Sequence, residues 1–188
     1  MDGHIAFAMD GLKNLVANVA DLLDRQLALL VDTRFSNGLP ANLSGATGPR
    51  AAINHGLKAV QIAASAWTAE ALKLTMPASV FSRSTECHNQ DKVSMGTIAA
   101  RDALRVLELS EQVAAAHTIA CVQAVRLRQR AGELSDAAIG PGVAALINDA
   151  RVPFIDEDAP LDKVLIELNS AIATRRWHLD WPGDEAVV

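Results

Sequence analysis

Residues 84–91 of this 188-residue chain bring together an unusual set of polar side chains. They read Ser-Thr-Glu-Cys-His-Asn-Gln-Asp and lie between two stretches with a helical pattern. Exposed connections are more often built from glycine, proline and serine, so an acid, an imidazole and two amides indicate a binding loop. Glu86 beside Asn89 and Gln90 suits an ammonium group and a polar side-chain tip. Because Glu86 and Gln90 are four residues apart, a helical turn here would align them.

The same block also fits a purely structural role. Asn89 or Asp91 could cap the helix that follows, with help from Ser94. The residue types alone leave both interpretations open.

Lys58 is a second residue that could contribute chemistry. Its neighbours over residues 56–64 are otherwise mostly small or apolar, and Ile62 shares its helical face. In one interpretation Lys58 lines a pocket with Glu86 as its counter-ion. In the other, the ammonium extends into water while the stem covers apolar surface.

The two cysteines, Cys87 and Cys121, indicate neither a disulfide framework nor a metal site. Cys87 with His88 lacks the paired spacings of a zinc site, and His117 with Cys121 adds only one further pair. Residues adjacent in sequence seldom face one another, so a Cys-His nucleophile is also unsupported. We expect no metal, and we interpret His117 as a core histidine with satisfied hydrogen bonds.

The spacing of apolar residues indicates the helices that must position these groups. It predicts helices over residues 5–31, 51–74, 93–130, 135–150 and 161–174, with a structured loop over 35–50. The helix over 93–130 would be about 57 Å long. Its centre is apolar on nearly every face and therefore has to be buried on every face. We expect other copies of the chain to cover it.

Composition narrows the possible classes of function. Apolar residues make up 50% and aromatic residues 4%, which favours closely packed helices rich in Ala and Leu. The net charge of −5 without a basic stripe gives no reason to expect nucleic acid. Arg126, Arg128 and Arg130 lie near a predicted helix end, where they complement the helix dipole. No apolar run reaches the roughly 18 residues of a membrane span, and no signal peptide begins the chain. We expect a cytoplasmic protein.

These segments together resemble the aromatic amino acid ammonia-lyases and 2,3-aminomutases, enzymes that use a methylideneimidazolone prosthetic group. The resemblance covers roughly residues 4–173. It is carried by four stretches: Asn-Gly-Leu-Pro at 37–40, Gly-Leu-Lys at 56–58 with Ile62, the polar block leading into Val-Ser-Met-Gly at 93–96, and Val-Pro-Phe at 152–154.

The resemblance implies a substrate pocket lined by Lys58, Ile62, Glu86, Asn89 and Gln90. These residues would lie near the amino group and ring of an aromatic amino acid, with Ile62 as an apolar wall. Histidine-specific members usually carry Glu at the position of Gln90. The resemblance therefore favours phenylalanine or tyrosine over histidine as the substrate.

The groups that perform the family's chemistry are absent from this sequence. The family forms its electrophile by cyclising Ala-Ser-Gly and uses a Tyr as base, and neither that tripeptide nor any Tyr occurs here. The nearest string, Leu43-Ser44-Gly45, belongs to the Asn-Gly-Leu-Pro loop. The resemblance implies a C-terminal portion without catalytic residues, with the methylideneimidazolone expected in an N-terminal half that this sequence lacks.

We therefore predict an all-α bundle of long antiparallel helices over residues 1–175, followed by an irregular tail over 176–188. We predict that the chain is a C-terminal fragment of an aromatic L-amino acid ammonia-lyase or of a 2,3-aminomutase, and that it is inactive alone. The lyase reaction eliminates ammonia and gives an arylacrylate. We expect a homotetramer that associates through residues 93–130 and binds neither nucleic acid nor membrane. The alternative is a non-catalytic helical scaffold for oligomerisation, or one half of a split enzyme.

Overall fold

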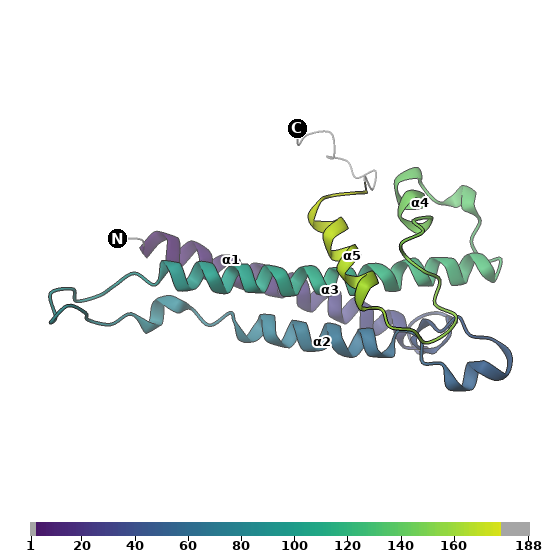
Figure 1. Ribbon diagram of the computed structural model, residues 1–188, viewed down its shortest axis with the longest axis horizontal. Coiled ribbons are helices and arrows are strands. Elements are labelled where there is room, and N and C mark those ends of the chain that lie inside the picture. The colour runs from purple at the N-terminus through teal and green to yellow at the C-terminus, as the bar shows by residue number, and fades with distance from the viewer. Residues whose placement is uncertain (1–2, 178–188) are drawn as a thin grey trace.

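Three long helices lie side by side in the computed structural model, which describes residues 3–177 (Figure 1). Helices α1 (Gly3–Val31) and α3 (Gly96–Arg130) run in the same direction, and α2 (Lys58–Lys73) runs antiparallel to both. No β-strand occurs among the described residues. The predicted all-α bundle is confirmed, with two of its three long helices parallel to each other.

Shorter helices gather at the end of the bundle where α3 finishes. Helix α5 (Asp162–Ala173) packs across α3, and α4 (Pro141–Ile147) lies near the C-terminal end of α3 (Figure 1). Short 3-10 helices occupy the connections: η1 (Ala41–Leu43), η2 (Gly48–Ile53), η3 (Ala78–Phe81) and η4 (Asp136–Ala138).

The second long helix begins later than predicted, at Lys58 instead of residue 51. Gly56 interrupts the helical path with a φ of 55°. The backbone amides of His55 and Gly56 donate to the Asp158 carboxylate at 2.8 and 2.9 Å. Asp158 lies far along the chain, so the local pattern of apolar residues could not reveal this contact.

The predicted helix over 135–150 is also divided. Residues 136–138 form η4, and α4 starts afresh at Pro141. Proline has no amide hydrogen to donate and fits the first turn of a helix, so it favours a new start over continuation. At the C-terminus, Arg176 and Trp177 are not helical, and residues 178–188 of the predicted tail lie outside the described part of the chain.

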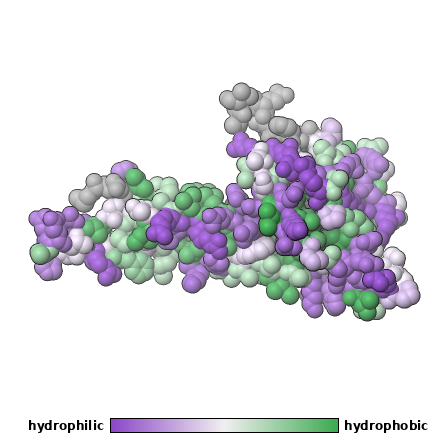
Figure 2. Space-filling model, viewed as in Figure 1, coloured by the Kyte–Doolittle hydropathy of each residue, from purple (hydrophilic) through white to green (hydrophobic). Residues whose placement is uncertain are grey.

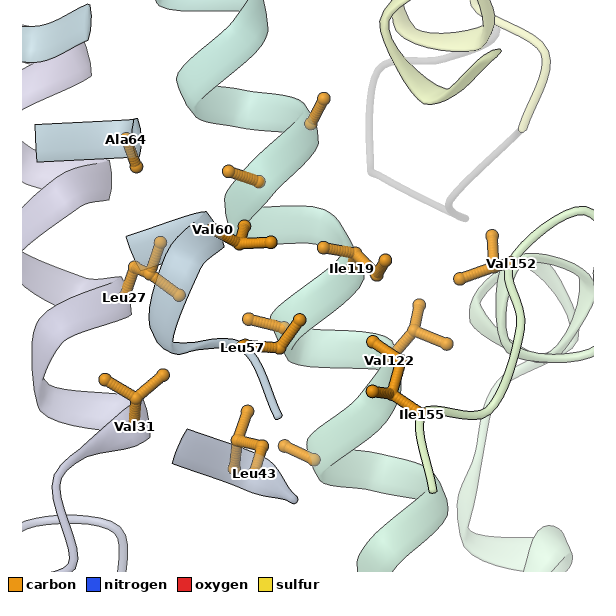
Figure 3. Packing of buried hydrophobic residues seen from close by; sticks show 14 of the residues in the cluster. Leu27, Val31, Leu43, Leu57, Val60, Ala64, Ile119, Val122, Val152 and Ile155 are labelled. Atoms are coloured by element: carbon orange, nitrogen blue, oxygen red, sulfur yellow. The ribbon is translucent and has the colours of Figure 1, made fainter. Parts of the chain in front are cut away.

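The main hydrophobic core lies where the loops meet the ends of the long helices. Leu27 and Val31 of α1 lie near Leu57 just before α2, and Ile119 of α3 and Ile155 belong to the same cluster around α3 (Figure 3). Each is at most 9% exposed. Burying such a side chain contributes about 1.5–3 kcal/mol, so this cluster holds the loops, α2 and α3 together.

Helix α3 is covered mainly by its own chain. Helices α1, α2 and α5 all pack along it, and no residue over 109–129 is exposed. Burial of the apolar centre therefore does not require other copies of the chain, contrary to our argument from the sequence. Association between chains stays a prediction. No helix in the described part of the chain is long and apolar enough to cross a membrane.

Side chains near the end of α3 hold the loops by their backbone carbonyls. Gln123 is 1% exposed and donates to the carbonyls of Leu43 and Ile155 at 3.0 and 2.9 Å. Its own carbonyl accepts from the Ile155 amide at 3.0 Å. One buried amide side chain thus joins the Asn-Gly-Leu-Pro loop to the segment before α5.

The arginines of this region have a more specific role than complementing a dipole. Arg128 and Arg130 lie in the last turn of α3, as predicted. Arg128 donates to the carbonyl of Asn37 at 2.7 Å, and Arg130 donates to that of Gly45 at 2.8 Å. Arg126 donates to the carbonyl of Ile147 at 2.9 Å. The guanidinium groups therefore bind carbonyls of other segments.

Candidate functional site

The polar block forms the tip of an arm, residues 76–95, that projects beyond the ends of the long helices (Figure 1). Thr85 and Gln90 pair in an antiparallel bridge, with amide-to-carbonyl distances of 3.0 and 3.2 Å. Residues 86–88 between them all have positive φ, from 52° to 66°. The tip is therefore a hairpin-like turn and not a right-handed helical turn, and its backbone conformation is costly for residues other than glycine.

The three predicted binding residues of this block nevertheless lie together. One carboxylate oxygen of Glu86 accepts from the Asn89 amide at 3.3 Å and from the Gln90 amide at 3.2 Å. All three residues are exposed. The tip thus offers a carboxylate beside two amides, an arrangement that suits an ammonium group with further hydrogen-bonding partners.

The alternative role, capping the helix that follows, does not hold for Asn89 or Asp91. Helix α3 begins at Gly96 without a side-chain cap from the residue before it. Ser94 alone assists, because its hydroxyl accepts from the Gly96 amide at 3.2 Å. The Asn89 side chain is directed instead to Glu86.

Lys58 and Ile62 lie at the opposite end of α2 from the arm. Lys58 is the first residue of this 16-residue helix, which spans about 24 Å. The arm leaves from the far end (Figure 1). Both side chains are exposed, Ile62 by 58%. The proposed pairing of Lys58 with Glu86 is therefore not made within one chain.

Two hollows lie near these groups. One, of about 910 Å³, is lined by Gly3, Asn89, Gln90 and residues 91–94. The other, of about 660 Å³, lies between the start of α2 and α5 and includes Trp67 in its wall, but neither Lys58 nor Ile62 lines it. The arm cluster therefore borders an open hollow of its own.

Sequence reasoning missed Asp158, which shapes the turn before Lys58. Its carboxylate accepts from the backbone amides of His55 and Gly56 and lies 3.2 Å from the imidazole Nδ1 of His55. The His55 amide is the largest cause that lowers the pKa of Asp158, against an opposing effect of desolvation. No local signal marks this residue, because its partners come from a distant segment.

Cys121 and His117 form a contact without evident reactivity. The thiol sulfur lies 3.7 Å from the imidazole Nδ1, and both residues are half-buried. Burial lowers the pKa of His117 and raises that of Cys121, so both stay neutral near neutral pH. No cluster of three potential metal-ligating side chains is found among residues 3–177.

Comparison with known proteins decides the family. Residues 1–151 match the family model described as aromatic amino acid lyase. The chain belongs to the aromatic amino acid lyase family. The resemblance inferred from the motifs is thereby confirmed.

Individual members of the aromatic amino acid lyase family are similar over most of this chain. A tyrosine ammonia-lyase of Cereibacter sphaeroides is 34% identical over 168 residues, which are 89% of this chain and 31% of that protein. A histidine ammonia-lyase of Staphylococcus saprophyticus is 40% identical over 124 residues, 66% of this chain and 24% of its own length. The crystal structure of a tyrosine aminomutase from Streptomyces globisporus matches with 30% identity and a TM-score of 0.80, over 91% of this chain and 31% of that one. The chain therefore spans less than a third of the length of these relatives.

Proposed function

We propose that this chain is the C-terminal, substrate-positioning part of an aromatic L-amino acid ammonia-lyase or 2,3-aminomutase. The lyase reaction removes ammonia and leaves an arylacrylate, whereas the mutase returns the ammonia at the β-carbon. The observation that carries the proposal is the cluster of Glu86, Asn89 and Gln90 at the tip of the arm, in a chain that belongs to this family.

The proposed pocket needs more than one copy of the chain. Lys58 and Ile62 lie at one end of α2, and the arm leaves from the other. A homotetramer would bring the arm of one copy to the start of α2 in another. In such a pocket Glu86 would bind the substrate ammonium and Ile62 would contact the ring. The contribution of these residues would be to orient the substrate.

Phenylalanine or tyrosine is the proposed substrate in preference to histidine. Gln90 stands where histidine-specific members usually carry Glu. A neutral amide can donate and accept hydrogen bonds, but it cannot form an ion pair with an imidazolium as a carboxylate does.

The residues of this chain do not fit the methylideneimidazolone group itself. That group forms from Ala-Ser-Gly, which the sequence lacks. In the nearest string, Leu43 is fully buried and the Gly45 amide donates to the Ile155 carbonyl at 2.8 Å, which fixes the backbone in place. We assign no catalytic residue to this chain and propose that it is inactive alone.

The test compares the chain alone with a fusion to the N-terminal remainder of the Cereibacter sphaeroides tyrosine ammonia-lyase. Arylacrylate release is followed by ultraviolet absorbance. We expect none from the chain alone, and release from the fusion with phenylalanine or tyrosine in preference to histidine. Glu86→Gln in the fusion should lower kcat/KM about 100-fold, equivalent to about 2.7 kcal/mol.

Glu167→Gln is the matched control, because Glu167 is exposed on α5, away from the arm. Arylacrylate formed by the isolated chain would contradict the proposal. So would a fusion that is active and insensitive to Glu86→Gln. A folded but inactive fusion would favour the alternative of a non-catalytic scaffold.

A further inference from the structure

Lys13 is a charged side chain completely buried inside the bundle. It lies on α1 with an exposed fraction of 0%. Its ammonium nitrogen is 2.9 Å from an Asp10 carboxylate oxygen and 3.5 Å from one of Asp102 on α3. It also donates to the backbone carbonyl of Met76 at 2.9 Å. Burial of an ammonium group is strongly unfavourable unless the group is paired and hydrogen-bonded, so the fold has to keep these contacts.

Asp10 extends this network to the segment that follows α2. Its two carboxylate oxygens accept from the backbone amides of Ala78 at 2.9 Å and Ser79 at 3.2 Å. Asp10 is 6% exposed. Desolvation raises its pKa, but the bonds to Lys13 and to the two amides together lower it, so the carboxylate is charged at neutral pH.

The segment held in this way, residues 76–79, is the root of the arm. Beyond it, Ser82 donates to the carbonyl of Val93 at 2.5 Å, which closes the base of the arm. The hydrogen bonds described for residues 83–91 have partners within the arm: Phe81, Ser84, Thr85, Glu86, His88, Asn89 and Gln90. The direction of the tip therefore depends on how the root is fixed.

Apolar burial could hold the root but would not orient it, because the hydrophobic effect is not directional. Hydrogen bonds do fix orientation, since they weaken steeply as their angles bend. We propose that Lys13, Asp10 and Asp102 are positioning residues that set the direction of the arm and so place its binding cluster. The role of the tip in binding substrate rests on the proposed function. The effect of the three residues on the position of the tip does not.

The exposed Cys87 at the tip offers a reporter of arm direction. In a Cys121→Ala, Asn18→Cys background of this chain, nitroxide labels at positions 87 and 18 would report the distance from the tip to exposed surface on α1. The distance distribution is measured by pulsed electron paramagnetic resonance, with labelled chain diluted in excess unlabelled chain. Circular dichroism of each sample reports helix content.

We expect Lys13→Met to shift and broaden the distance distribution while helix content is retained. The matched control is Lys73→Met, because Lys73 is exposed at the end of α2, close to the same arm. Its distance distribution should equal that of the unsubstituted background. A narrow, unshifted distribution in folded Lys13→Met would overturn the proposal. The role of Lys13 would then be only to stabilise the bundle.

Milder variants keep the test decisive if Lys13→Met does not fold. Asp10→Asn keeps the shape of the side chain but removes the charge that faces Lys13, and Asp102→Asn removes the longer ion pair. Both should broaden the distribution, Asp10→Asn more strongly. Unshifted distributions in both would equally overturn the inference. Because the labels report position and the Glu86→Gln fusion reports activity, either proposal can fail without the other.

Discussion

At the scale of single residues, Gln123 is a buried side chain that joins two distant segments. It makes three hydrogen bonds to buried backbone groups of Leu43 and Ile155. Gln123→Leu keeps a similar volume but leaves the Leu43 carbonyl and the Ile155 amide without partners, each at a cost of about 1–3 kcal/mol. The Ile155 carbonyl keeps the hydrogen bond from the Gly45 amide. We expect the free energy of unfolding to fall by about 3–5 kcal/mol. Urea denaturation followed by circular dichroism measures it.

Gln129→Leu on the same helix is the control. Gln129 makes one described side-chain hydrogen bond, to the exposed Asp136. We expect a loss below about 1 kcal/mol. Equal losses in the two variants would show that burial of the amide is not what matters.

Asp149 should make stability depend on acid pH. The Arg151 side chain lowers its pKa to about 2, against desolvation, and the Arg151 amide and the Trp177 indole also donate to it. The fold thus favours the ionised carboxylate, so its stabilisation is complete above about pH 5 and is lost as pH falls from about 4 towards 2. Asp149→Asn should lower the free energy of unfolding at pH 7 by about 1–2 kcal/mol, a value reduced for the exposure of Arg151.

Urea denaturation at pH 7 and near pH 2 measures this effect. The difference between Asp149→Asn and the unsubstituted chain should shrink at the lower pH, because both then carry a neutral group. A difference that stays constant with pH would mean that the carboxylate charge contributes nothing.

At the scale of elements, the start of α2 depends on Gly56. A Cβ atom there would lie 2.6 Å from the Asn42 carbonyl oxygen and 2.9 Å from backbone atoms of Ser44. Gly56→Ala must therefore displace the Asn-Gly-Leu-Pro loop as well as strain a φ of 55°. We expect a loss of about 3 kcal/mol or more, measured by thermal and urea denaturation.

Gly48→Ala separates the effect of the left-handed backbone from the effect of close packing. Gly48 has a similar φ of 62°, but a Cβ atom there would meet nothing within 4 Å. Its substitution should cost only about 1–2 kcal/mol, the price of left-handed backbone. If Gly48→Ala were as destabilising as Gly56→Ala, close packing would not explain the requirement for glycine at position 56.

At the scale of the whole molecule, exposed apolar side chains on α1 offer a further surface for association, besides the predicted one over residues 93–130. The centre of α3 is covered by its own chain, whereas α1 exposes Leu15, Val19, Leu22 and Leu29 by 50–66%. Figure 2 shows hydrophobic patches along the narrow part of the molecule, beside a hydrophilic tip. An apolar stripe of this length is unusual on a monomer. We expect homotetramers that bury the outer face of α1.

Sedimentation velocity tests this assembly. Leu15→Gln combined with Leu22→Gln should reduce the mass of the complex, whereas Leu72→Gln with Ile166→Gln should leave it unchanged. The control pair is exposed on α2 and α5. A monomer at every concentration would contradict the assembly, and dissociation by the control pair would place the contact elsewhere. A cytoplasmic location stays a prediction.

The sequence by itself determined the helical class, the long helices and the family. Helix type follows from local spacing of apolar residues, and α1 and α3 end at Val31 and Arg130 as predicted. It also brought Glu86, Asn89 and Gln90 into one group, because residues this close in the chain stay close in any turn. The motifs that carried the resemblance are short and local for the same reason.

The tertiary structure decided what depends on contacts between distant segments. Asp158 fixes the turn at Gly56 that precedes α2, and Gln123 joins two loops, yet neither has a signal in its own neighbourhood. The arm extends beyond the bundle and does not fold back along α2, and local spacing does not determine this direction. Likewise, nothing in the sequence around Lys13 distinguishes it from a surface lysine. Only its contacts with Asp102 and Met76 show that its ammonium group is buried and paired. Local patterns specify which elements form, whereas long-range hydrogen bonds and burial specify how they meet.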